Sequence, residues 1–172
     1  KSACNIEINI LNKSIGKQDQ YAAAYGGLNL IEFNKNGNTS VIPITLDYDK
    51  KTEMMGRFLM FNTGGVRSAN DILIKQSYNL ENSETHLELT KILVDLTYKL
   101  FSQLQANNIE EIGDILDQGW QVKKKLSSEI SNDYINKIYD KAIAAGAEGG
   151  KLLGAGSSGF LLFYAKKNFH EA

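Results

Sequence analysis

A glycine-rich stretch towards the C-terminal end, GGKLLGAGSSGF, has the residue types and spacing of a phosphate-binding loop. Gly154, Gly156 and Gly159 satisfy the pattern G-x-G-x-x-G, in which the backbone comes close to a nucleotide pyrophosphate. In a dinucleotide-binding fold this pattern follows a strand and opens a helix. Here the predicted order is the reverse. Residues 133–146 have helical spacing that ends at a glycine, and FLLFYA after the loop is typical of a buried strand.

We therefore expect the glycine loop to join a helix to a strand, which excludes the dinucleotide-binding fingerprint. A Walker A loop is also excluded, because no Lys-Ser or Lys-Thr follows the glycines and Lys151 precedes them. On this stretch alone, a tight glycine turn in an α/β domain is an equally good interpretation.

A second group of residues surrounds Asp19 in the segment GKQDQY. Glu7 lies twelve positions before Asp19, the pair Gly26-Gly27 follows it, and a TGGVR loop begins at Thr63. Taken together with the C-terminal glycine loop, these residues favour a functional site. A carboxylate at the start of a helix is also typical of an N-cap, so a purely structural role for Asp19 stays open.

Composition is ordinary for a soluble globular protein and excludes several classes of function. The chain has 172 residues, 42% hydrophobic and 23% charged, with a formal net charge of −1. That charge gives no electrostatic basis for binding nucleic acid or a membrane surface. The basic triplet 123–125 is interpreted as a solvated helix face. No apolar run approaches the roughly 20 residues of a membrane span. Cys4 is the single cysteine, which excludes an internal disulfide and favours a cytoplasmic protein.

The elements that must position these residues follow from hydrophobic periodicity. LNLIEF and TSVIPITL are predicted strands joined by the turn NKNGN, and RFLMFNT is a third strand. Residues 3–10 fit either a helix or a strand, and the polar stretch 47–56 is the best candidate for a domain boundary. Helices are predicted near Ser68 to Tyr78, from about Glu84 to Gln105, from Asn107 to near Leu126, and before the glycine loop. The pattern predicts an α/β (α+β) fold, with helices packed on a mainly antiparallel sheet.

Two segments together resemble a known family. GGKLLGAGSSGFLLFY resembles the third motif of the GHMP small-molecule kinases, and GKQDQY resembles the segment that carries their catalytic aspartate. The runs IGKQDQYAAAYGGLN and FNTGGVRSANDIL are most similar to the bacterial D-glycero-D-manno-heptose 7-phosphate kinases. The resemblance covers nearly all of the chain. It implies that residues 1–50 are the end of the N-terminal domain and residues 51–172 the C-terminal domain, with its ferredoxin-like sheet.

This sequence departs from the family pattern in two ways. Ser157 and Ser158 stand where the family loop commonly has glycines. The family's phosphate-binding loop, of the type P-x-x-x-G-L-G-S-S-A, and its basic N-terminal motif are not found here. We therefore expect the sequence to be the C-terminal part of a kinase, truncated at its end, and the 172-residue chain alone to be inactive with ATP.

The resemblance also implies roles for particular residues. Asp19 would orient or deprotonate the acceptor hydroxyl, and Glu7 would help to hold the Mg²⁺ that bridges two phosphates of ATP. Arg67 would bind a sugar phosphate through paired hydrogen bonds, whereas Lys17 is either a phosphate ligand or a solvated lysine. The other expected site residues are substrate-side positions (Gly26, Gly27, Thr63, Gly64) and the loop beside the nucleotide (Gly154, Gly156, Ser157, Ser158, Gly159).

The function implied by the resemblance is transfer of the γ-phosphoryl of ATP to the anomeric hydroxyl of D-glycero-D-manno-heptose 7-phosphate. Such a product would supply nucleotide-heptose synthesis for surface glycans. One alternative is another GHMP sugar kinase, acting on a hexose or fucose. A second alternative is a catalytically silent domain that binds a sugar. The expected partners are ATP and a sugar phosphate, with no nucleic acid and no membrane, while a homo-oligomer stays open.

Overall fold

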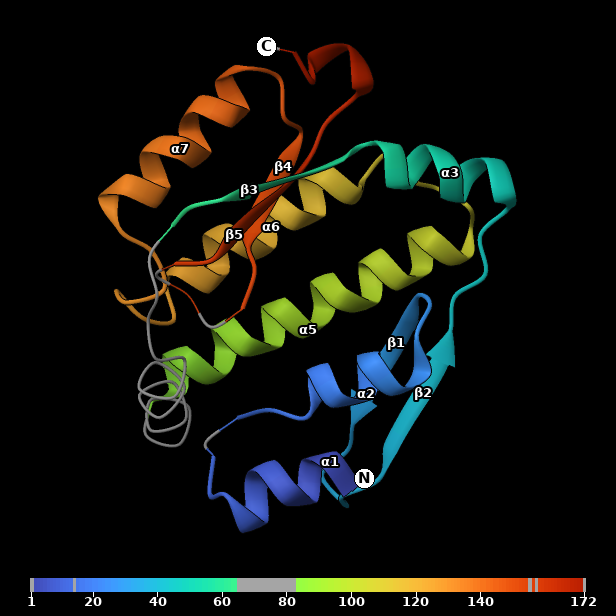
Figure 1. Ribbon diagram of the computed structural model, residues 1–172, viewed down its shortest axis with the longest axis vertical. Helices are drawn as coiled ribbons and strands as arrows, with labels where there is room; N and C mark the ends of the chain where they lie inside the picture. The colour runs from blue at the N-terminus through green and yellow to red at the C-terminus, as the bar shows by residue number, and fades with distance from the viewer. Residues whose placement is uncertain (1, 14, 65–82, 155, 157, 172) are drawn as a thin grey trace. The chain divides into compact units, whose positions relative to one another are not determined.

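The computed structural model describes residues 2–13, 15–64, 83–154, 156 and 158–171, and combines helices with antiparallel strands (Figure 1). The predicted helix near Ser68 to Tyr78 lies outside the described residues. In chain order the elements are α1 (Ser2–Cys4), the π-helix η1 (Asn5–Ile10), α2 (Gln18–Tyr25), β1 (Asn29–Phe33), β2 (Thr39–Pro43), α3 (Tyr48–Gly56), β3 (Phe58–Asn62), α5 (Glu84–Gln105), α6 (Ile112–Lys124), α7 (Asp133–Ala144), β4 (Gly149–Leu152), β5 (Phe160–Tyr164) and the 3₁₀ helix η2 (Lys167–Phe169).

The chain forms two compact units, Lys1–Leu46 and Asp47–Ala172. In the first unit, β1 and β2 form the predicted antiparallel hairpin, and Gly37 in its turn has a positive φ of 82°. Helix α2 packs on this hairpin through Tyr21, whose ring centroid lies 5.5 Å from that of Phe33. The first residues are helical rather than extended, which resolves the ambiguity in their periodicity. Assignment of residues 1–50 and 51–172 to two kinase domains stays a prediction.

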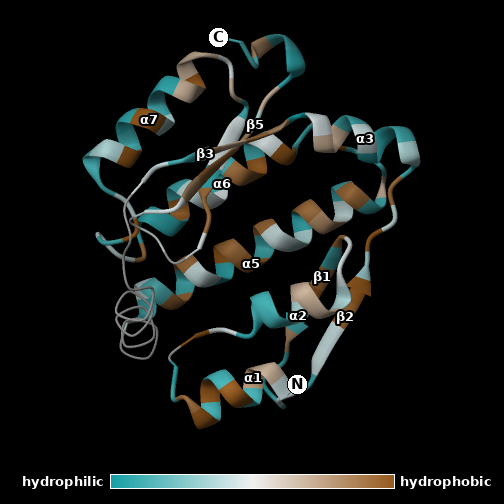
Figure 2. Ribbon diagram, viewed as in Figure 1, coloured by the Kyte–Doolittle hydropathy of each residue, from teal (hydrophilic) through white to brown (hydrophobic). Residues whose placement is uncertain are grey.

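In the second unit, three antiparallel strands form one sheet in the order β3-β5-β4. The predicted pairing of RFLMFNT with the strand after the glycine loop is confirmed, in a register that runs from Phe58 opposite Tyr164 to Asn62 opposite Phe160. Apolar residues recur along the whole length of α5 (Figure 2). The predicted class, helices packed with an antiparallel sheet, is confirmed.

The core of the second unit fixes the β4–β5 hairpin between helices. Leu161 and Phe163 are two positions apart on β5, so both point to one face of the sheet, and each is at most 1% exposed. Tyr139 of α7 lies on Phe163, with ring centroids 5.5 Å apart, and also contacts Trp120 of α6. Helix α7 ends in a Schellman motif, in which Gly146 takes a φ of 105° and Ala147 N–H donates to the carbonyl of Ala142.

One predicted helix start in this unit is wrong. Helix α6 begins at Ile112 rather than at Asn107, because Asn107 has a left-handed φ of 55°. Asparagine tolerates that conformation, and its Oδ1 accepts the backbone N–H of Asp47 at 3.0 Å. The polar stretch 47–56 contains helix α3, which exposes most of its residues and buries Met54. Its polarity therefore reflects a solvated helix, and the division between the two compact units falls at the start of this stretch, between Leu46 and Asp47.

Arg57 ties the start of β3 to the α5–α6 connection. Its side chain is 9% exposed, and its two terminal nitrogens donate to the carboxylate oxygens of Glu110 at 3.0 and 2.8 Å. It also pairs with Glu53. Hydrogen bonds from Arg57 hold the pKa of Glu110 below its usual value and raise that of the guanidinium. No helix in the described ranges is long and apolar enough to span a membrane.

Candidate functional site

Asp19 is the second residue of α2, and its side chain is exposed. The N-cap position is Lys17, which is exposed and makes no side-chain capping hydrogen bond. The capping interpretation of Asp19 is therefore wrong. Among the described residues no hydrogen bond or ion pair occupies its oxygens. A carboxylate in the first turn of a helix is stabilised by the helix dipole, so Asp19 can present a negative charge to a ligand.

Glu7 is joined to the helix that carries Asp19 by a side-chain hydrogen bond. Gln20, the residue after Asp19, donates from Nε2 to Glu7 Oε1 at 3.0 Å, and both side chains are partly buried. This bond links η1, which carries Glu7, to α2, which carries Asp19. Gln20 was not among the predicted site residues, because its position beside Asp19 gives no sequence signal for a contact with η1.

Glu7 could bind a magnesium ion only if it were the single protein ligand of that ion. In the described part of the chain, no group of three or more His, Cys, Asp or Glu residues could hold a metal ion. Glu7 Oε1 accepts the bond from Gln20, so Oε2 is the oxygen available to a cation. Mg²⁺ keeps several waters and is often held by one carboxylate plus substrate phosphates. The fit is therefore to a magnesium that arrives with a nucleotide.

Gly26 and Gly27 end α2 in conformations that other residues seldom adopt. Their φ angles are 61° and 69°, and the N–H of Gly26 donates to the carbonyl of Ala22 at 2.9 Å. A Cβ atom at either glycine would meet nothing within 4 Å, so the backbone angle rather than crowding requires glycine here. A contact between these glycines and substrate stays a prediction.

In the second unit, the glycine loop joins two antiparallel strands, so the predicted helix-to-strand connection is wrong. β4 begins at Gly149, and sequence missed it because glycine has low strand propensity. Both glycines of β4 lie where backbones come close. A Cβ on Gly149 would lie 2.0 Å from the Gly113 carbonyl oxygen of α6, and one on Gly150 would lie 2.5 Å from that of Leu162. Gly159 leads into β5 and not into a helix, which confirms the exclusion of the dinucleotide-binding fingerprint.

The three glycines of the G-x-G-x-x-G pattern all have positive φ angles. The values are 82° at Gly154, 130° at Gly156 and 123° at Gly159. Gly156 is also crowded, since a Cβ there would lie 2.7 Å from Ile130 Cα. The N–H of Ser158 donates to the Gly156 carbonyl at 2.9 Å, whereas Ser157 lies outside the described residues. The loop is therefore a compact backbone turn held against the segment between α6 and α7.

Thr63 connects the end of β3 to this loop. Its N–H donates to the Gly159 carbonyl at 2.8 Å, and its hydroxyl donates to the same carbonyl at 3.0 Å. The hydroxyl also accepts the Gly159 N–H at 3.1 Å. Gly64 follows with a φ of 71°, and its N–H donates to Asn62 Oδ1. The structure thus joins Thr63 to the glycine loop, while Arg67 lies outside the described residues.

Lys123 holds the other end of the loop. Its Nζ donates to the Gly154 carbonyl at 2.8 Å, so the interpretation of the basic triplet as a solvated face is wrong for this residue. Burial, together with the nearby charge of Lys151, lowers the pKa of Lys123 to about 8. Burial also lowers the pKa of Lys151. No motif in the sequence distinguishes Lys123 from its two lysine neighbours.

Comparisons with known proteins match this fold. Residues 100–172 match the family model "GHMP kinases C terminal". The chain is 34% identical over 164 residues to the D-glycero-alpha-D-manno-heptose 7-phosphate kinase of Campylobacter jejuni, covering 95% of the chain and 48% of that relative. It is 29% identical over 157 residues to the bifunctional fucokinase/GDP-fucose pyrophosphorylase of Arabidopsis thaliana, covering 88% of the chain and 14% of the relative.

A solved structure shares the fold over almost the whole chain. The crystal structure of a D-glycero-D-manno-heptose 1-phosphate kinase from Bacteroides thetaiotaomicron superposes with a TM-score of 0.71 at 28% identity, covering 98% of this chain and 44% of the other. The chain thus spans about half the length, or less, of the relatives that it matches. Residues 100–172 thus match the C-terminal domain of the GHMP kinases, and nearly all of the chain is similar to sugar kinases.

Proposed function

We propose that the protein that contains this chain transfers the γ-phosphoryl of ATP to the anomeric hydroxyl of D-glycero-D-manno-heptose 7-phosphate. The observation that carries this proposal is the 34% identity, over 95% of the chain, to a relative named for a heptose 7-phosphate substrate. The 28% identity to a solved D-glycero-D-manno-heptose 1-phosphate kinase supports a heptose phosphate as the class of substrate, without indicating which hydroxyl is phosphorylated.

Asp19 is the residue that would accept the proton of the acceptor hydroxyl. Its carboxylate is exposed, lies in the first turn of α2 and has no competing bond among the described residues. As the new O–P bond forms, the hydroxyl proton would pass to this carboxylate and ADP would leave. Phosphoryl transfer has a loose transition state, so positioning and a proton acceptor are the main demands on the protein.

Glu7 would bind the magnesium of Mg·ATP through its second carboxylate oxygen, with Gln20 fixing the first. When bound, the ion would neutralise charge on the phosphates. The glycine loop would shape the phosphate side of the site with its backbone, and the Thr63–Gly159 bonds would keep the loop in place. Arg67 is proposed to bind the sugar phosphate because a guanidinium can form two parallel hydrogen bonds with it.

A fucose or hexose kinase is the second candidate function. The observation that favours it is the 29% identity, over 88% of the chain, to a relative whose name includes fucokinase. The two candidates differ in the acceptor: a heptose 7-phosphate carries a dianionic group, whereas a free hexose carries none. Arg67→Ala should therefore raise KM for a phosphorylated sugar far more than for ATP, and should leave a free-sugar kinase almost unchanged.

The deciding experiment uses protein expressed from the complete reading frame. Turnover with Mg·ATP is measured for heptose 7-phosphate, fucose and galactose, and phosphorus NMR locates the new phosphate on the product. We expect the highest kcat/KM for heptose 7-phosphate and a phosphate on the anomeric carbon. A preference for fucose or galactose would establish the second candidate. Sugar binding without any turnover would establish a catalytically silent domain instead.

A further inference from the structure

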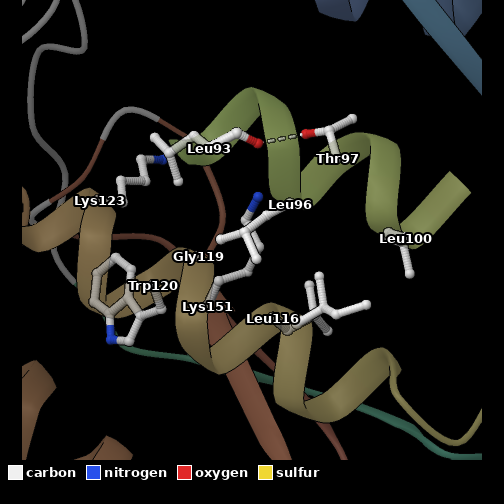
Figure 3. Close-up of a pocket in the computed structure, with 10 residues that line it drawn as sticks. Leu93, Leu96, Thr97, Leu100, Leu116, Gly119, Trp120, Lys123 and Lys151 are labelled. Carbon is white, nitrogen blue, oxygen red and sulfur yellow. Dashed lines mark hydrogen bonds between the residues drawn. The ribbon is translucent and has the colours of Figure 1, made fainter. Parts of the chain in front are cut away.

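A cavity of about 240 Å³ lies between α5 and α6, beside β4, in the second unit (Figure 3). Its apolar wall is formed by leucines on both helices, namely Leu93, Leu96, Leu100 and Leu116. Two lysines are the charged residues of the lining, Lys123 from α6 and Lys151 from β4, and no carboxylate lines it. The hydroxyl of Thr97 is used within α5, where it donates to the Leu93 carbonyl at 2.9 Å. The walls of the cavity are therefore apolar, and one side of it carries the positive charges of the two lysines.

Lys151 carries its ammonium group into this space. Figure 3 shows its side chain rising from β4 towards α5, with Nζ close to Leu96. Within the described ranges, no hydrogen bond or ion pair reaches that nitrogen. A charged group among apolar side chains is costly unless an opposite charge pairs with it. The lowered pKa of Lys151, which burial causes, reflects the same cost. An anion bound beside Lys151 would lower the cost of its unpaired charge.

Gly119 gives a separate indication that the cavity has a function, because a glycine at this position keeps it open. It lies in the interior of α6 and lines the cavity, and glycine is less favourable than alanine inside a helix. Close packing does not require it, because a Cβ atom there would meet only Leu93 Cδ2, at 3.9 Å. Its effect is to keep the wall between α5 and α6 open.

We propose that this cavity binds a small amphipathic monoanion, a carboxylate on a short hydrocarbon chain. The chain would lie against the leucines of α5 and α6, and the carboxylate would pair with the ammonium of Lys151. Lys123, whose Nζ already holds the Gly154 carbonyl, would contribute a second positive charge nearby. Neither ATP nor a sugar fits this lining, since their hydroxyls and multiple charges would be left without partners. The site is thus separate from the chemistry proposed for Asp19.

Octanoate is the probe that tests this proposal, by isothermal titration into protein from the complete reading frame. Octylammonium has the same chain with the opposite charge, and inorganic phosphate has the charge without the chain. We expect saturable binding of octanoate at one site and no binding of either control. Equal heats from octylammonium would show unspecific apolar binding and would overturn the proposal, as would the absence of any octanoate heat.

Two variants locate the binding in this cavity. Lys151→Met keeps the length of the side chain and removes its charge, and should weaken octanoate binding at least about tenfold. Gly119→Leu places a side chain in the cavity, and should abolish binding while α6 becomes more stable. Lys125→Met, one residue beyond α6 and exposed, is the matched control and should bind as the wild type does. Circular dichroism checks that each variant is folded. Wild-type affinity in both Lys151→Met and Gly119→Leu would overturn the proposed site.

Discussion

Thr63 and Gly159 are bound to each other by three hydrogen bonds, although they lie 96 positions apart in the chain. The β3–β5 register ends with Asn62 opposite Phe160, so this pair continues the ladder by one step. The hydroxyl oxygen of Thr63 accepts the N–H of Gly159, in the place that a backbone carbonyl would take in a regular ladder. The side chain of Thr63 thus fixes the point at which the glycine loop enters β5.

Replacing Thr63 with valine should release this end of the loop. The valine keeps the shape of the side chain but leaves the Gly159 N–H without its acceptor, which costs about 1–2 kcal/mol of unfolding free energy. Amide hydrogen exchange at Gly159 should accelerate, and urea unfolding gives the loss of stability. Thr63→Ser retains the hydroxyl and should behave like the wild type. Slow exchange at Gly159 in the valine variant would show that the hydroxyl does not hold the loop.

Alanine substitutions at Gly154 and Gly156 should differ in their cost. Both have positive φ angles, so each substitution imposes backbone strain of roughly 1 kcal/mol or more. At Gly154 the new Cβ would meet nothing within 4 Å, whereas at Gly156 it would clash with the Ile130 backbone. We expect Gly156→Ala to lose at least about 1 kcal/mol more than Gly154→Ala in urea unfolding. Equal losses would mean that backbone strain alone, without crowding, sets the cost.

The parts of the fold that sequence predicted are those with strong local signals. The hairpin β1–β2 has a turn rich in asparagine and glycine between two apolar runs, and α5 has a leucine at almost every turn. Strand β4 gave no such signal. Gly149 and Gly150 are present because α6 and β5 approach their backbones closely, and that crowding is a tertiary property. Local propensity therefore predicted a loop where packing produces a strand.

The candidate site was predictable only where its residues form motifs. Asp19 and the three loop glycines were proposed as site residues from their segments, whereas the contacts made by Gln20 and Lys123 could not be predicted from theirs. Each of these two side chains reaches an element distant in sequence, so its partner depends on the packing of helices against neighbouring elements. Lys123 also belongs to a run of three lysines, which is typical of an exposed helix face. Its burial beside Lys151 could not be read from that run.

Burial of Lys123 should make stability depend on pH in a particular direction. Its pKa is about 8 in the folded chain, against 10.5 for an unburied lysine, so the unfolded chain binds more protons between these values. The unfolding free energy contributed by Lys123 therefore rises with pH from about 8 to 10.5 and is lowest below pH 8. Lys151 and the Gly154 carbonyl are the polar groups that face it.

The measurement compares wild type with Lys123→Met by urea unfolding at pH 7 and pH 10. The methionine variant has no charge to bury, so the difference between the two proteins should shift in favour of the wild type by on the order of 1–3 kcal/mol at the higher pH. Lys125→Met, at an exposed position, controls for the loss of one lysine and should show no such shift. A constant difference across this pH range would contradict the burial of a charged Lys123.

Asp19→Asn separates the catalytic role proposed for this residue from a structural one. Asparagine keeps the size of the side chain but cannot take up a proton, and general-base and positioning roles of this kind contribute roughly 10²–10⁴ in rate. We expect kcat of the protein from the complete reading frame to fall by about that factor, with little change in KM for ATP. Stability should change by less than about 1 kcal/mol, because Asp19 does not cap α2 and contributes only through the helix dipole.

Asp133→Asn is the matched control, since Asp133 is also an exposed carboxylate in the first turn of a helix, α7. It loses the same dipole interaction and should leave kcat unchanged. Wild-type turnover in Asp19→Asn, or an equal fall in both variants, would reject the catalytic role of Asp19.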